Sequence, residues 1–310
     1  MHQNIDDKLR MLLMLDWLRP ERAIMRLFKT IYLEKIDFRS PSLDLSCGDG
    51  SLMFLHFGGR FEDNFDHFLA TSANQFSHDK FVDIYDVKPP PPLKPKIKFP
   101  PNRVIDFGTD WKEELLSKAR DLGVYGELIH HDNNQLPLPF GDSSLATVFS
   151  NAIYWIDEME NAMKDIHRIL QPGGQIILQV MTPNFLGTLD RLDGILSDRA
   201  INILDRNRRA TMPSPRSYSE WANITKKAGF REVAIESMFP NEFLIDIWNV
   251  GLRPISHLLI QMANELDLDR RRRIKKEWVD IFHTLFLQLV STPPNCPIEN
   301  SPYLQITARK

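Results

Sequence analysis

Short apolar runs alternate with segments of helical periodicity between residues 41 and 180. The runs lie at 41–45, 103–110, 126–132, 146–151 and 169–180, and turn residues separate them from the intervening segments. Between them, as at 111–122, apolar residues recur every three or four positions, which predicts helices. Strands that alternate with helices favour a parallel, doubly wound α/β sheet with right-handed crossovers. Ligands of such sheets bind outside the carboxyl ends of the strands.

The flanking regions are predicted to be mainly helical. Apolar positions between 6 and 37 have helical spacing with a break at Pro20. These helices either pack beside the sheet as core or help to cover a substrate. Near the other end, 232–239 and 302–308 read as two further strands, and two amphipathic helical stripes lie between them. A basic run at 270–276 separates the stripes and reads as a solvated helix start, with contact to an anionic lipid or phosphorylated substrate as the alternative.

An unusually long segment separates the first strand from the end of the second. Gly50 and Asp110 are sixty positions apart, whereas a nucleotide-binding unit has its acid roughly 20 residues after its glycines. The insertion is rich in phenylalanine, including Phe76 and Phe81, and ends in a proline run at 88–96 that can form neither a helix nor a central strand. It is either a surface linker or a lid or oligomer contact.

The first strand ends in a turn suited to close approach of a ligand. The sequence Pro41-Ser-Leu-Asp-Leu-Ser-Cys-Gly-Asp-Gly50 places an acid and two glycines between a strand and a helix. The second and third strands each end in an acid, at Asp110 and Asp132. Later come an LPLPFGDSSL segment at 136–145 and an RILQPGG turn at 168–174.

This series resembles the class I S-adenosylmethionine-dependent methyltransferases, in particular the small-molecule type that carries LPF…D and RxLxPGG segments. The resemblance extends from about residue 41 to 180, less firmly to 239, and does not include 51–104. It implies a Rossmann-like, mostly parallel seven-stranded sheet with an antiparallel last strand, here with helical cap insertions. The expected parts are N-terminal helices at 1–40, a cofactor-binding core at 41–183, 217–240 and 301–310, a Phe/Pro-rich insertion at 51–102, and substrate-covering caps at 184–216 and 241–300.

The resemblance also implies that S-adenosylmethionine is the cofactor and S-adenosylhomocysteine the product. The residues that it places at the cofactor are Asp44, Ser46, Gly48, Gly50, Asp110, Trp111, Asp132, Asn133, Ser150 and Asn151. Asp110 is placed to accept the ribose hydroxyls, with Asp106 as its competitor, and Asp132 to accept from the adenine amino group. Ser46 is a departure, because the family usually has its first glycine there.

Residues expected at the acceptor follow the fourth strand or lie in the caps. Tyr154 and His131 are candidates for catalysis, and Trp155, Arg208 and Arg209 for substrate binding; each also has a purely structural reading. Clustered arginines can hold a phosphate or carboxylate. The expected reaction is in-line methyl transfer to a small or medium-sized acceptor, such as an anionic sugar, lipid-linked or secondary-metabolite hydroxyl. No cluster has metal-ligand spacing.

Composition narrows the alternatives. A net charge of −3 and a pI near 6.3 argue against a nucleic-acid partner, so an RNA methyltransferase is the weaker hypothesis. A non-catalytic binding module and a dehydrogenase are further alternatives, but the turn has no third glycine for the latter. With two cysteines, one inside the glycine turn, and with no evident signal peptide or membrane span, we expect a cytoplasmic protein. Peripheral membrane contact and a homodimer stay open.

Overall fold

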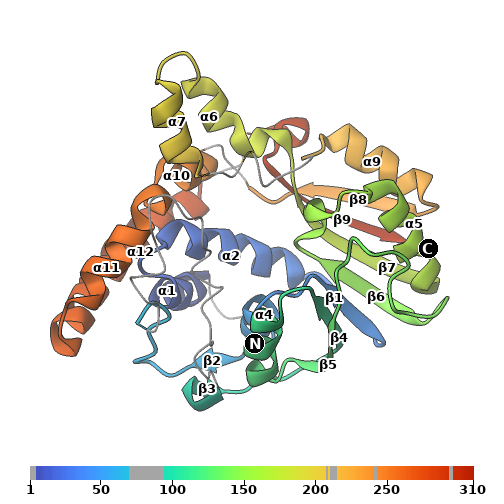
Figure 1. Cartoon of the computed structure of the whole chain (residues 1–310), viewed down its shortest axis with the longest axis horizontal. Helices are drawn as coiled ribbons and strands as arrows, with labels where there is room; N and C mark the ends of the chain where they lie inside the picture. Colours follow the sequence, from blue (N-terminus) through green and yellow to red (C-terminus); the bar gives the residue numbers. More distant parts are fainter. Residues whose placement is uncertain (1–4, 70–93, 207–208, 210–214, 240–242, 293–295) are drawn as a thin grey trace.

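The computed structural model describes residues 5–69, 94–206, 209, 215–239, 243–292 and 296–310. Its centre is a seven-stranded sheet, which occupies the right-hand side of Figure 1. In spatial order the strands are β5 (Tyr125–His130), β4 (Ile105–Asp110), β1 (Ser42–Leu45), β6 (Leu145–Ser150), β7 (Leu170–Met181), β9 (Tyr303–Arg309) and β8 (Arg231–Ser237). The doubly wound α/β sheet predicted from the sequence is confirmed.

Strand directions also follow the prediction. The strands from β5 to β7 are parallel to their neighbours, and β9 is antiparallel to both β7 and β8. The chain runs from β1 outward to β4 and β5, then returns to β6 on the other side of β1. Asp44 of β1 is therefore in register with both Gly108 of β4 and Phe149 of β6. The order reverses beside β1, and ligands of such sheets bind at that point.

Helices cover the sheet on both faces and divide the core into two. On one face, α5 (Met159–Ile169) and α9 (Tyr218–Lys227) pack with β7 and β8 around the buried Trp221. A capping box of Ser217 and Glu220 starts α9. The other face carries the larger core, to which α1 (Ile5–Leu15), α2 (Pro20–Leu33), α3 (Ser51–His56) and α4 (Glu113–Leu122) contribute. The predicted break between the first two helices is confirmed, with Pro20 at the start of α2.

The described part of the phenylalanine-rich insertion joins this larger core. Its strands β2 (Arg60–Phe61) and β3 (Ile97–Phe99) pair antiparallel. Phe76, Phe81 and most of the proline run lie outside the described residues. Arg271 of α12 (Leu268–Val290) donates to Asp66 at 2.8 Å, and Lys275 donates to the Phe65 carbonyl at 2.9 Å. Both basic side chains are buried, so the prediction that the whole 270–276 run is solvated was wrong for these two.

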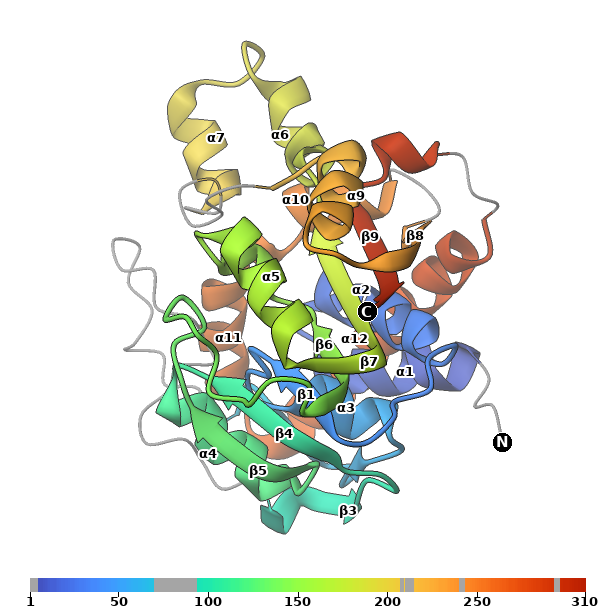
Figure 2. The ribbon, with the colours of Figure 1, turned by 90° about the vertical axis from the view of Figure 1, so that its right-hand side faces the viewer.

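The remaining helices lie in the segments predicted as caps, 184–216 and 241–300. They are α6 (Gly187–Leu192), α7 (Asp198–Asp205), α10 (Phe243–Val250) and α11 (Ser256–Asn264). The first two project from the top of the molecule in both ribbon views (Figures 1 and 2). By length and composition, and among the described residues, Phe243–Asn264 could cross a membrane, with a mean hydropathy of 1.2. No such segment was expected from the sequence. In the fold it comprises α10, a 3-10 turn containing Pro254, and α11.

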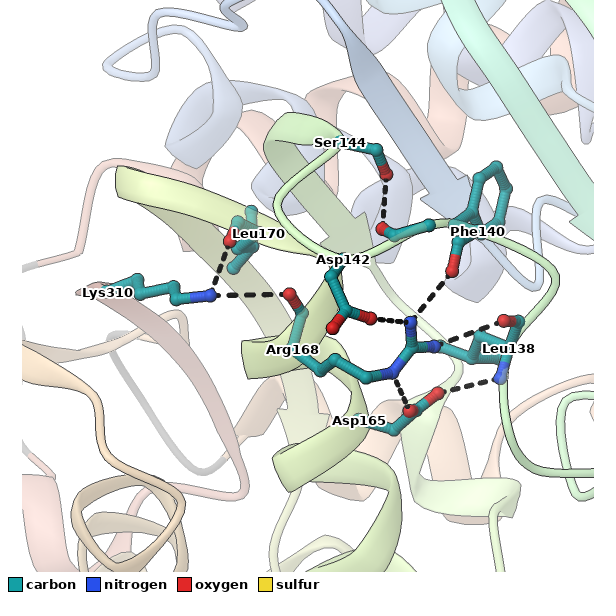
Figure 3. Close-up of polar contacts among 9 residues, drawn as sticks. Leu138, Phe140, Asp142, Ser144, Asp165, Arg168, Leu170 and Lys310 are labelled. Carbon is teal, nitrogen blue, oxygen red and sulfur yellow. Dashed lines mark hydrogen bonds and ion pairs between the residues drawn. The ribbon is translucent and has the colours of Figure 1, made fainter.

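Arg168 ties the LPLPFGDSSL segment to the helix that precedes the Pro-Gly-Gly turn (Figure 3). Its guanidinium donates to the Asp165 carboxylate at 2.6 Å and to the Asp142 carboxylate at 2.8 Å, and also to the Phe140 and Leu138 carbonyls. The two carboxylates raise the pKa of Arg168 above its usual value. The arginine of RILQPGG thus fixes the loop that leads from β5 back to the centre of the sheet.

Candidate functional site

A cavity of about 960 Å³ lies at the carboxyl ends of the central strands. Its walls come from the glycine turn after β1, the ends of β4, β5 and β6, one face of α2, and the caps around α7, α10 and α11. Ligand pockets span about 300–1,000 Å³, so this one is near the upper limit for a single small ligand. The sheet side of the cavity lies where the polarity of the predicted strands placed it. The tertiary structure shows which helical residues form the other side.

The glycine turn offers open backbone to the cavity. Ser46, Gly48 and Gly50 alternate in the left-handed region, with φ of 62°, 60° and 71°. A Cβ built on Gly48 meets nothing within 4 Å, so this glycine faces open space, whereas one built on Gly50 would approach the Tyr125 ring to 2.9 Å. Ser46 keeps the backbone shape that glycine usually supplies, and its hydroxyl accepts from Asn133 at 2.8 Å. Gly48 is therefore available to a ligand, and Gly50 is required for packing.

Asp110 terminates β4 beside this turn. Its Oδ2 accepts from the Gly48 N–H at 3.0 Å and its Oδ1 from the Lys112 N–H at 3.0 Å. Burial raises the pKa of this carboxyl, and the two N–H donors offset part of that rise. Each oxygen keeps a second lone pair for a hydroxyl donor. Trp111 follows; it is 62% exposed and lines the cavity, as suits a ring that stacks on a ligand.

Asp106, the competitor for the ribose role, is at the other end of β4. Its carboxylate accepts from the Ser42 N–H and hydroxyl, both at 2.7 Å. It is not part of the cavity wall. The structure therefore gives Asp110 and not Asp106 the position for ligand contact.

The other predicted cofactor residues divide between the wall and the layer behind it. Asp132, Asn133 and Asn151 line the cavity together with Ser46, Gly48, Asp110 and Trp111. Ser150 is fully buried and donates to the Leu45 carbonyl at 2.7 Å. Asp44 lies beneath the turn and accepts from the Tyr125 hydroxyl at 2.6 Å. Asp44, Gly50 and Ser150 thus support the turn from behind.

Of the residues predicted at the acceptor, some line the cavity and others do not. Tyr154 and Trp155 line the cavity. His131 is not part of that wall, and its Nε2 lies 3.1 Å from the Gln135 carbonyl. Arg209 is exposed, pairs with Asp190 at 2.9 Å and is also absent from the wall. Arg208 lies outside the described residues.

Sequence reasoning missed a cationic stripe on α2. Arg19, Arg22, Arg26 and Lys29 all line the cavity, at a spacing that keeps them on one helix face. Arg26 donates to the Ser51 hydroxyl at 2.8 Å, directly after the glycine turn, and Arg22 and Arg26 both pair with the buried Asp16. The sequence signal is this polar stripe opposite an apolar one, which ordinarily indicates a solvated face.

The burial of several like charges along α2 shifts the pKa values of neighbouring groups. Burial, and then Arg26 and Arg22, lower the pKa of Lys29 to about 7. The Lys29 amine lies 5.2 Å from the Tyr303 ring centroid, and the described residues give it no carboxylate partner. Burial alone would raise the pKa of the Asp49 carboxyl in the turn. Arg26 and Arg22 outweigh this effect and hold that pKa well below its usual range. The turn side of the cavity therefore combines cations with balancing acids.

Known proteins share the central part of this chain. A methyltransferase-domain family model matches residues 104–178. Malonyl-[acyl-carrier protein] O-methyltransferase 1 of Coxiella burnetii is 30% identical over 86 residues, which cover 27% of this chain and 28% of that protein. A ubiquinone/menaquinone biosynthesis C-methyltransferase of Haemophilus ducreyi is 28% identical over 105 residues, covering 33% and 39%. The chain thus spans less than half the length of these relatives.

Among solved structures, a methyltransferase of Thermotoga maritima aligns with 95% of this chain and 92% of its own, at 15% identity and a TM-score of 0.49. That likeness is too low to support any statement about function. The strand order, with its reversal beside β1, defines an α/β protein of the doubly wound class. The residues that match the methyltransferase-domain family, 104–178, run from β4 into β7.

Proposed function

We propose that the protein binds S-adenosylmethionine on the sheet side of the cavity and transfers its methyl group to a small or medium-sized acceptor on the helical side. The observation that carries this proposal is the continuity of the cavity. One space of about 960 Å³ joins the glycine turn and Asp110 to Tyr154, Trp155 and the caps. Cofactor and acceptor can therefore meet without a rearrangement of the sheet.

The residues present suit the cofactor. Asp110 offers a carboxylate to a ribose diol, Gly48 leaves room for close approach, and Trp111 supplies an exposed ring for adenine. Asp132, on the same wall, offers an acceptor for the adenine amino group. Arg26, fixed on Ser51, is placed to pair with the carboxylate of the methionine part.

S-adenosylmethionine supplies an activated methyl group, so the protein has chiefly to align the acceptor and exclude water. Tyr154 and Trp155 line the same cavity, and an aromatic ring there can face a sulfonium. Burial and the neighbouring Tyr154 raise the pKa of Tyr303 well above its usual value. Tyr303 therefore stays protonated and acts as a hydrogen-bond donor or as packing, not as a base.

Calorimetric titration with S-adenosylmethionine and S-adenosylhomocysteine tests the cofactor, with NAD as the control. We expect micromolar binding of the first two and none of NAD. Binding of NAD alone would refute the proposal and favour a dehydrogenase. If none of the three binds, the alternative of a non-catalytic module gains support. Salt-sensitive retention of RNA would instead favour the RNA-methyltransferase alternative.

A further inference from the structure

The cations of the cavity outnumber its carboxylates. Seven arginine and lysine side chains line it, and three carboxylates do. The excess is uneven, because Arg22 and Arg26 pair with Asp16, and Arg19 pairs with Glu21. On the cap side, Arg206 and Arg253 form no ion pair with any carboxylate among the residues that the structure places. The positive charge at this end of the cavity is therefore offset by the nearby Asp205 and Glu21 carboxylates and not by a direct ion pair of either arginine within the described residues.

The two cap arginines hold each other's backbone. Arg206 follows α7, and its Nη1 donates to the Arg253 and Pro254 carbonyls at 3.3 and 3.2 Å. Arg253 precedes α11, and its Nη1 donates to the Asp205 and Leu204 carbonyls at 2.7 and 3.4 Å. Each guanidinium is thus anchored through one terminal nitrogen only. Within the described part of the chain, Nε and Nη2 of both arginines have no protein partner.

The surrounding groups concentrate this charge. Arg206 Nη1 lies 3.1 Å from His257 Nδ1, an arrangement that requires Nδ1 to be unprotonated and therefore an acceptor. The Asp205 carboxylate accepts from the Arg209 backbone N–H, whose nitrogen lies 3.2 Å from each carboxylate oxygen. Burial, followed by Arg19 and Arg206, lowers the pKa of Arg253 to about 10. Arg253 is therefore still charged at neutral pH, although Arg19 and Arg206 repel it.

We propose that Arg206 and Arg253, with Arg19 beside them, form a subsite that binds an oxyanion of the methyl acceptor, either a phosphate or a carboxylate group. A planar guanidinium whose orientation is already fixed loses little entropy when it binds such a group through two parallel N–H donors. The subsite lies in the cavity wall together with Tyr154 and Trp155. An acceptor held by its anionic group would therefore reach toward the cofactor side.

That the anion belongs to a methyl acceptor rests on the proposed function, but the binding of an anion can be measured independently. Inorganic phosphate and malonate are titrated by calorimetry into protein saturated with S-adenosylhomocysteine, and into the free protein, with sodium chloride at matched ionic strength as the baseline. Binding of phosphate alone would identify a phosphorylated acceptor, and binding of malonate alone a carboxylated one. If the free protein binds the anion but S-adenosylhomocysteine does not bind, the proposed function fails and the subsite stands.

Arg206→Gln and Arg253→Gln should each weaken anion binding at least about tenfold, since each removes charge-assisted hydrogen bonds. Arg209→Gln is the matched control, because Arg209 follows the same helix but lies outside the cavity wall, and it should change anion affinity less than twofold. Arg253→Lys keeps the positive charge but removes the pair of parallel N–H donors, so we expect an intermediate loss of anion affinity. It also serves if Arg253→Gln does not fold, since the lysine can still reach the α7 carbonyls. The proposal is overturned if neither anion binds better than chloride, or if the Arg209 variant loses as much affinity as the cavity variants.

Discussion

Asp110→Ala tests the assignment of the ribose-binding acid. The two hydroxyl groups of a ribose diol each donate one hydrogen bond, and a hydrogen bond to a charged group contributes about 1.5–3 kcal/mol. Removal of the carboxylate should therefore cost about 3–6 kcal/mol of binding, which is roughly 10²–10⁴ in the dissociation constant. The substitution also deprives the Gly48 and Lys112 N–H groups of their acceptor, so a part of the loss will arise from the turn.

The structure supplies a control of the same kind in the same strand. Asp106→Ala likewise removes the carboxylate acceptor of a backbone N–H, that of Ser42, but at the far end of β4 from the cavity. Calorimetry with S-adenosylhomocysteine, accompanied by thermal melts, should show a loss of at least about 100-fold for Asp110→Ala and less than threefold for Asp106→Ala. Equal losses, or full affinity in the Asp110 variant, would refute the ribose assignment.

Three further predictions concern the fold around the site. Ser46→Ala keeps the strained φ of 62° but loses the bond from Asn133, whereas Ser46→Gly loses the bond and relieves the strain; chemical unfolding should find the glycine variant more stable by about 1–2 kcal/mol, and equal stability would contradict the strain. Arg271→Met should cost about 3–5 kcal/mol because it breaks the buried ion pair with Asp66, while Arg272→Met, at an exposed pair with Asp269, should cost at most about 1 kcal/mol; equal costs would count against the buried pair. Burial raises the pKa of Asp44 to about 7, so this group contributes stability at acidic pH that is lost as the pH rises from about 4 to 7; Asp44→Asn should flatten that part of the stability–pH profile of the free protein, and an unchanged slope would contradict the shift.

The sequence predicted the sheet well because its signals are local. Apolar runs bounded by glycine and proline located all seven strands, and the spacing of the helical stripes located α1, α2, α11 and α12. Strand polarity then placed Gly48, Asp110 and Asp132 at one edge without any further information. The family resemblance carried the cofactor assignment, because spacing alone does not distinguish ligands of this fold.

What the sequence could not supply depends on contacts between distant segments. In the sequence, Arg26 and Lys29 belong to a polar stripe of the kind that faces solvent, but in the fold they line the cavity. Arg271 likewise belongs to a basic run of the kind found on a surface, but in the fold it pairs with Asp66, 205 positions away in the chain. Arg206 and Arg253 meet only because α7 and the turn before α11 pack together, 47 positions apart in the chain. Charge is local to a residue, but its burial and its partners are tertiary properties. The sequence by itself therefore determined the sheet and its ligand-binding edge, and only the tertiary structure decided which cations face the cavity.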